Sequence, residues 1–196
     1  MSDDHVSTPL AARVRRFEER LAAAGLVDDA ELDAILDRFL AGAAPVNGAR
    51  IVARAWTDAA FRDRLLADAN AALPELDLSM RSGLQEQRLK VIANTAARHN
   101  VIVCTLCSCY PIGLLGPSPS WYKSEAYRAR VVREPRAVLA EFGLELPAEV
   151  EITVWDASAE SRYMVLPVRP AGTDGLSETE LAGLVTREGL IGTAAV

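Results

Sequence analysis

The feature that most constrains this chain is its cysteine usage: all three cysteines, Cys104, Cys107 and Cys109, lie within six residues. An odd, clustered set of cysteines is not a disulfide framework, and in a reducing compartment it is more typical of a metal or redox site. On a regular strand or helix the three side chains of a C-x-x-C-x-C segment would diverge. The spacing therefore predicts a tight turn that gathers the sulfurs, and the backbone amides of the turn, around one centre.

Several chemistries compete for such a cluster. A structural zinc site normally takes four protein ligands, but no second cysteine pair follows and His99 precedes Cys104 by five residues. A thioredoxin-like pair would place Cys104 and Cys107 at a helix start, which Cys109 and Pro111 disfavour. Three inert buried cysteines are a further alternative. The remaining hypothesis is a claw of thiolates and deprotonated amide nitrogens, a ligand set that suits low-spin Co(III) or Fe(III).

Hydrophobic patterning divides the chain into a helical first part and a mixed second part. The predicted helices are 8–24, one beginning after Asp28-Asp29, 49–73 with a restart at Thr57-Asp58, 124–131 and 135–142; the predicted strands are 89–92, 101–103, 150–155 and 162–166. Residues 42–48 and 111–120 are predicted breaks because of their prolines and glycines. Ser177 to Glu180 is typical of a helix N-cap and first turn.

The predicted fold class is α+β, with a helical N-terminal arm (1–45) followed by a mixed α/β layered domain (46–196) that carries the cysteine claw loop. A length of 196 residues suits one domain with an appended arm. The net charge of −6 and the pI near 5.0 argue against a nucleic-acid partner. No run approaches the ~18 apolar residues of a membrane helix, and no signal peptide is recognisable, so we expect a cytoplasmic protein.

The segment from Val103 to Tyr110, Val-Cys-Thr-Leu-Cys-Ser-Cys-Tyr, resembles the metal-binding segment of the nitrile hydratase α-subunit family. Thr105 and Tyr110 resemble the cobalt form of that family. At Ala93 the chain departs from the family, which has glutamate before Asn-Thr. The resemblance covers roughly residues 47–193 and includes Ala55–Asp58, Ser118–Arg136, Trp155-Asp156, Arg169–Gly175, Thr186–Glu188 and Ile191-Gly192.

This resemblance implies an enzyme, a lyase that hydrates a nitrile to an amide at a non-corrin, low-spin Co(III) centre, with Fe(III) as the less favoured metal. It implies sulfur ligands from Cys104, Cys107 and Cys109, and backbone nitrogen ligands from Ser108 and Cys109. It also implies oxidation of Cys107 to cysteine sulfinic acid and of Cys109 to cysteine sulfenic acid. The metal acts as a Lewis acid on the nitrile, and the attacking oxygen stays open among metal hydroxide, an outer water and the Cys109 sulfenate.

Further roles follow from the resemblance. The catalytic residues are Cys109, Ser108, whose hydroxyl donates to an oxidised sulfur, and Gln85, which matches a family glutamine near the substrate. Tyr110 and Trp121 are candidates for the substrate pocket, since aromatic walls suit organic nitriles. Each has a plainer alternative: packing in the core or an interface for the two aromatic residues, and an ordinary polar position for Gln85.

The implied partners are a β-type subunit, whose arginines bind the oxidised cysteines, a cobalt-inserting activator protein and a small organic nitrile. The nitrile stays open among aliphatic, aromatic and nucleoside nitriles such as toyocamycin. The nearest alternative function is that of the thiocyanate hydrolase γ subunit, which shares the claw. An alternative from another class is a non-enzymatic zinc-binding interaction module. We expect His99 to be structural, and the following arginines to form surface or interface ion pairs: Arg128, Arg130, Arg133 and Arg136.

Overall fold

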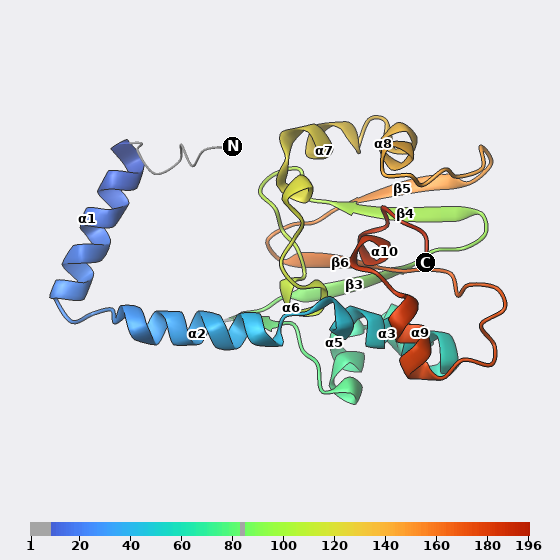
Figure 1. The fold of residues 1–196 in the computed structure, drawn as a ribbon, viewed down its shortest axis with the longest axis horizontal. Coiled ribbons are helices and arrows are strands. Elements are labelled where there is room, and N and C mark those ends of the chain that lie inside the picture. The colour runs from blue at the N-terminus through green and yellow to red at the C-terminus, as the bar shows by residue number, and fades with distance from the viewer. Residues whose placement is uncertain (1–8, 83–84) are drawn as a thin grey trace. The chain divides into compact units, whose positions relative to one another are not determined.

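The computed structural model describes residues 9–82 and 85–196, without the side chains of residues 39, 81, 82, 85 and 86 (Figure 1). The chain divides into two compact units, Met1–Ala41 and Gly42–Val196. Helices dominate the first unit, whereas the second combines helices with short strands. The predicted α+β fold class is therefore confirmed. The proposed division at residue 45 stays a prediction.

The first unit consists of two helices whose apolar side chains face solvent. Helix α1 is Pro9–Ala23 and helix α2 is Asp29–Gly42, in agreement with the predicted positions. Helix α1 buries none of its residues, and Phe17 is 62% exposed. Their apolar stripes were predicted from helical periodicity, but within the described residues these stripes do not form a core.

Two pairs of parallel strands organise the second unit. The strands are β1 (Arg81–Ser82), β2 (Gln85–Glu86), β3 (Arg88–Ala93), β4 (Arg98–Val103), β5 (Glu151–Asp156) and β6 (Ser161–Leu166). Strand β3 pairs with β6 and β4 pairs with β5, while β1 and β2 form a short antiparallel pair. Because β4 and β5 are parallel, a long crossover joins them, and it begins with the cysteine segment. The register places Val103 opposite Asp156, so the crossover starts beside the carboxyl end of β5.

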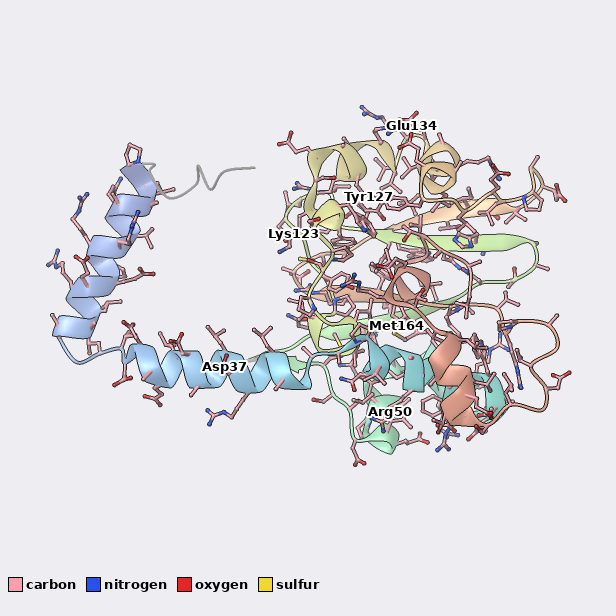
Figure 2. All side chains as sticks on the ribbon, viewed as in Figure 1. Asp37, Arg50, Lys123, Tyr127, Glu134 and Met164 are labelled. Atoms are coloured by element: carbon pink, nitrogen blue, oxygen red, sulfur yellow. The ribbon has the colours of Figure 1, made fainter. Side chains whose placement is uncertain are left out.

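Short helices cover these strands (Figure 1). They are α3 (Pro45–Thr57), α4 (Ala59–Ala67), α5 (Ala69–Ala72), η2 (Leu73–Leu76), α6 (Ile112–Leu115), η3 (Ser120–Lys123), α7 (Glu125–Arg130), α8 (Pro135–Glu141), α9 (Glu178–Leu184) and α10 (Arg187–Ile191). Helices α4 and α5 contact β3, α8 contacts β5 and α10 contacts β6. The core between them includes fully buried Ile51, Leu65 and Met164, the last of which Figure 2 labels among the strands.

Local capping follows the sequence, and the two predicted breaks are present but shorter than predicted. Asp58 accepts from the Phe61 N–H and restarts the helix, and Ser177 forms a complete capping box, both as predicted. The break predicted at 42–48 ends early, because Pro45 opens α3, where its missing N–H costs nothing. Asn47 then donates to the carbonyls of Gly42 (2.8 Å) and Gly113 (2.9 Å). The loop predicted at 111–120 contains the one-turn helix α6.

His99 has the structural role predicted for it. Its side chain is buried, and Nε2 lies 2.7 Å from the carbonyl oxygen of Gly192 while Nδ1 lies 3.2 Å from the side-chain nitrogen of Asn94. The carbonyl must accept and the amide nitrogen must donate, so the neutral ring with its proton on Nε2 satisfies both partners. Burial lowers the pKa of His99, and the bond to Gly192 only partly offsets this.

We expect the free energy of unfolding to fall as the pH drops below about 6.5, the ordinary pKa of histidine. Because the folded pKa of His99 lies below the unfolded one, the unfolded chain binds the extra proton in the interval between them. Stability is thus complete above the unfolded pKa and declines by at most ~1.4 kcal/mol per pH unit down to the folded pKa. Urea titrations of the wild type and His99→Gln measure the difference; identical pH slopes would contradict this assignment.

Candidate metal centre

The turn predicted after the strand at 101–103 is present and brings the three sulfurs together. Cys104 follows directly after β4 and is fully buried, Cys107 is exposed and Cys109 is partly exposed. The Sγ atoms lie 3.5 Å apart for Cys104 and Cys107 and 3.1 Å apart for Cys107 and Cys109, and all three lie within 4.8 Å of one another. The sulfurs therefore converge on one small region at the end of a parallel strand.

This donor set fits a thiophilic metal. Three sulfurs so close to one another fit around a shared centre at ordinary metal–sulfur distances of about 2.3 Å. Within the described ranges the cluster contains neither histidine nor carboxylate. A four-ligand structural zinc site therefore finds no fourth side chain there. The exposed side of the cluster leaves room for an exchangeable ligand, and the backbone amides of the turn are the remaining donors close by.

The environments of the two less exposed thiols differ. Burial raises the pKa of Cys104, but the N–H groups of Cys107 and Cys109 point at its sulfur and bring that pKa down to about 7. Burial and the contact with Cys107 raise the pKa of Cys109 to about 12, and the nearby Arg162 only partly opposes this. Of these two thiols, Cys104 therefore ionises first. A metal that binds all three sulfurs must displace the proton of Cys109, so its binding releases protons.

Three side chains from other elements hold the turn. Asp156, at the end of β5, accepts from the N–H of Thr105 (2.9 Å) and from its hydroxyl (2.5 Å). Arg128 of α7 donates to the carbonyl oxygens of Thr105 (2.9 Å) and Leu106 (3.2 Å). The Tyr122 hydroxyl donates to the Cys109 carbonyl oxygen at 3.0 Å. Our sequence reasoning did not assign these roles, since the partners are up to 51 residues apart.

The two aromatic residues proposed for the substrate pocket are packed against other rings. Tyr110 is buried and lies edge-on to Tyr122, with ring centroids 5.0 Å apart. Trp121 is partly buried against Tyr127 (4.9 Å) and Phe142 (4.6 Å). The Tyr110 hydroxyl is buried and has no hydrogen-bond partner among the described residues, and burial raises its pKa. These contacts account for both rings as packing residues, and their pocket roles stay predictions.

The other predicted residues lie as follows. Ser108 is partly exposed between the second and third cysteines. Gln85 lies in β2 opposite Ser82, but its side chain is outside the described part of the chain, so its role stays a prediction. Arg130 forms the expected ion pairs, with Glu134 and Glu141. Two other arginines bind backbone carbonyls within the described residues, and interface ion pairs stay a prediction for them: Arg128 and Arg136.

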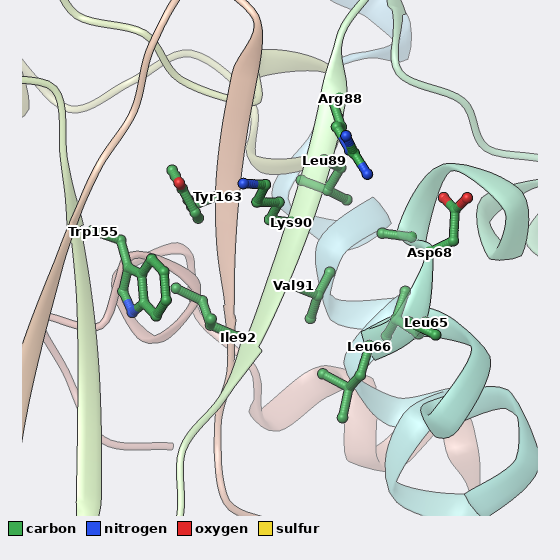
Figure 3. A pocket seen from close by; sticks show the side chains of 12 residues that line it. Leu65, Leu66, Asp68, Arg88, Leu89, Lys90, Val91, Ile92, Trp155 and Tyr163 are labelled. Carbon is green, nitrogen blue, oxygen red and sulfur yellow. The ribbon is translucent and has the colours of Figure 1, made fainter.

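A separate pocket of about 240 Å³ lies between α4, α5 and the strands (Figure 3). Its wall includes Leu65, Lys90, Trp155 and Tyr163, and the Lys90 ammonium lies 5.8 Å from the centre of the Tyr163 ring. The residues that line it do not include the cysteines or any other predicted site residue. This pocket is therefore distinct from the cysteine turn.

Comparison with known proteins gives a consistent picture. A family model described as nitrile hydratase, alpha chain, matches residues 8–194. The chain is 50% identical over 185 residues to the low-molecular weight cobalt-containing nitrile hydratase subunit alpha of Rhodococcus rhodochrous, which covers 94% of this chain and 88% of that protein. It is also 46% identical over 158 residues to the thiocyanate hydrolase subunit gamma of Thiobacillus thioparus, covering 76% of this chain and 65% of that one.

The fold is likewise similar to that of a solved structure. A double mutant of the Fe-type nitrile hydratase from Comamonas testosteroni Ni1 superposes with a TM-score of 0.87 at 42% identity, covering 99% of this chain and 92% of the other. Within residues 9–82 and 85–196, no helix is long and apolar enough to cross a membrane.

Proposed function

Because the chain belongs to the nitrile hydratase α-chain family, we propose that it is the metal-bearing subunit of an enzyme that hydrates a nitrile to the corresponding amide. The observation that carries the proposal is the convergence of three sulfurs, within 4.8 Å of one another, in the turn that follows β4. The cysteine spacing alone predicts such a site, and the geometry of the turn fits it. Thiocyanate hydrolysis is the second candidate, and the lower coverage of that relative makes it the weaker one.

The metal proposed for this site is low-spin Co(III), with Fe(III) as the alternative that the iron-type structural relative keeps open. Its ligands are the sulfurs of Cys104, Cys107 and Cys109 and the backbone nitrogens of Ser108 and Cys109. When bound, the metal supplies Lewis-acid polarisation of the C≡N carbon, which water then attacks. Cys107 is the proposed sulfinic acid and Cys109 the proposed sulfenic acid, in agreement with the exposure of both sulfurs.

The chain's own residues present this site to substrate. Asp156 and Arg128 fix the first half of the turn, so its exposed face keeps one orientation. Ser108, between the two proposed oxidised cysteines, is the proposed hydroxyl donor to an oxidised sulfur. Gln85 is the proposed orienting residue for the substrate, and Tyr110 and Trp121 are the proposed apolar wall. A nitrile is neutral and carries an apolar group, which suits such a wall.

A partner subunit completes the proposed site. Oxidised sulfurs carry negative charge and require charge-assisted donors, which we assign to arginines of a β-type chain. Leu106, 86% exposed beside the cysteines, is an apolar contact for that chain. The helical arm, residues 1–45, supplies a second contact through its exposed apolar side chains. A cobalt-inserting activator protein is the proposed metal source, and the proposed location is the cytoplasm, where free thiols persist.

We expect the chain, expressed with its partner in cobalt medium, to contain one cobalt ion and three additional oxygen atoms, two on one sulfur and one on another. Elemental analysis measures the metal, and intact mass measures the oxygens. Parallel expression in zinc medium is the control. A different result would support a non-enzymatic zinc module: the chain expressed in cobalt medium, with its activator protein present, would contain stoichiometric zinc and unmodified thiols.

The same preparation separates the two enzymatic candidates. We expect amide formation from a small organic nitrile to exceed thiocyanate hydrolysis. A preference for thiocyanate at full metal content would contradict the nitrile hydratase assignment while leaving the metal site intact. Assaying the α chain without its partner tests the heteromer, because full activity of the isolated chain would exclude a shared site.

A further inference from the structure

Arg128 contacts the cysteine turn at a position where it can determine how the peptide groups face. One nitrogen of its guanidinium, Nη2, donates to the carbonyl oxygens of Thr105 and Leu106, at 2.9 and 3.2 Å. Both carbonyls lie between the first and second cysteines. Arg128 therefore binds the backbone of the turn through these two carbonyl oxygens.

Helix α7 holds Arg128 in place through its neighbour. The buried hydroxyl of Tyr127 donates to the carbonyl oxygen of Ile102 at 2.7 Å, two residues before Cys104. Ser124 caps the same helix through the N–H of Tyr127. Figure 2 shows Tyr127 between α7 and the strands. This contact ties the helix that carries Arg128 to β4, the strand that Cys104 follows, and so holds Arg128 close to the turn.

The orientation of the peptide groups follows from their planarity. In a trans peptide the C=O of one residue and the N–H of the next point in opposite directions. The Leu106 carbonyl faces Arg128, so the Cys107 N–H faces the other way, and it donates to Cys104 Sγ at 3.3 Å. The Thr105 carbonyl also faces Arg128, and the Leu106 N–H of that peptide likewise acts on the Cys104 sulfur.

We propose that Arg128 is a positioning residue that turns the N–H groups of Leu106 and Cys107 onto the Cys104 sulfur and thereby weakens that sulfur as an electron donor. Each N–H···S bond withdraws electron density from the sulfur, and such outer-shell contacts tune a metal and its ligands. The electronic part of this inference rests on the proposed function, because it requires a bound metal. The orientation of the two N–H groups does not.

The first test uses the metal-free full chain and measures amide hydrogen exchange. In Arg128→Met the exchange of the Leu106 and Cys107 amides is expected to accelerate at least ~10-fold, because their hydrogen bonds open more often. The control is Arg130→Met, on the same helix, whose guanidinium pairs with Glu134 and Glu141. Unchanged exchange in a folded Arg128→Met chain would overturn the proposal.

Arg128→Lys keeps the experiment decisive if the methionine variant does not fold. A lysine keeps a cationic donor, but its ammonium is a strongly hydrated point charge on a flexible stem, so it holds the two carbonyls less firmly than Nη2 of Arg128 does. It should therefore give exchange at both amides that is faster than in the wild type but slower than in an unprotected chain. Wild-type rates at both amides in Arg128→Lys would contradict the geometric argument.

The second test uses the cobalt-loaded complex with its partner subunit. At equal cobalt content, Arg128→Met is expected to shift the sulfur-to-metal charge-transfer band to longer wavelength, since the Cys104 sulfur becomes a stronger donor. An unshifted band with accelerated amide exchange would overturn the electronic part alone. A wild-type complex without cobalt would overturn the proposed function, while the exchange experiment would still decide the role of Arg128.

Discussion

Replacing Cys109 by alanine is expected to abolish cobalt binding and to lower nitrile hydration by at least ~10³-fold. The change removes one of three converging sulfurs, 3.1 Å from that of Cys107. Loss of an outer-shell partner typically costs a metal site about 10–100-fold, and loss of a direct ligand must cost more. The fold should persist, because the side chain of Cys109 is partly exposed and its carbonyl still accepts from Tyr122.

The measurements are cobalt content, turnover and thermal unfolding of the complex with its partner. Tyr122→Phe is the matched control: it removes the hydrogen bond to the Cys109 carbonyl but leaves all three sulfurs, so cobalt should remain. The loss of one hydrogen bond costs about 1 kcal/mol of stability. A Cys109→Ala complex that retains cobalt and activity would show that this sulfur is not a ligand. If the wild-type protein bound zinc and the Cys109→Ala variant unfolded, the non-enzymatic zinc module would be favoured.

The cysteine turn was predictable because its information is local. Three cysteines within six residues, next to a β-type run, are enough to predict converging sulfurs in a turn. The helix restart at Asp58 and the capping box at Ser177 are local in the same sense, since each depends on a side chain and a backbone N–H three residues apart. Local patterns of this kind can be recognised in the sequence without knowledge of the tertiary structure.

The supports of the turn were not predictable, because they depend on the crossover between β4 and β5. Asp156 reaches Thr105 across 51 residues only because the two strands are parallel and in register. Arg128 and Arg130 look alike in sequence, but residues two apart on a helix point in nearly opposite directions. One therefore faces the cysteine turn and the other faces Glu134 and Glu141. Charge and composition do not distinguish them.

Gly192→Ala is expected to destabilise the second unit by roughly 2–6 kcal/mol, the sum of backbone strain (~1–3) and overpacking (~1–3). Gly192 ends α10 with a φ of 90°, which side chains rarely adopt. A Cβ atom there would lie 2.0 Å from the carbonyl oxygen of Asn100 and 2.9 Å from the Cα of Val101. Both neighbours are backbone atoms of β4, so neither can rotate away.

The control for this change is Gly183→Ala, within α9, where no atom lies within 4 Å of the added methyl group. Alanine favours helix there by up to about 1 kcal/mol, so the control should be neutral or slightly stabilised. Urea unfolding of both variants measures the difference. The His99 ring also bonds the Gly192 carbonyl, and this bond partly offsets the lowering of the His99 pKa by burial. Its loss with the ring still buried should lower that pKa further and extend the decline of stability to lower pH. A Gly192→Ala chain with wild-type stability and an unchanged pH slope would mean that Gly192 does not lie against the backbone of β4 in solution.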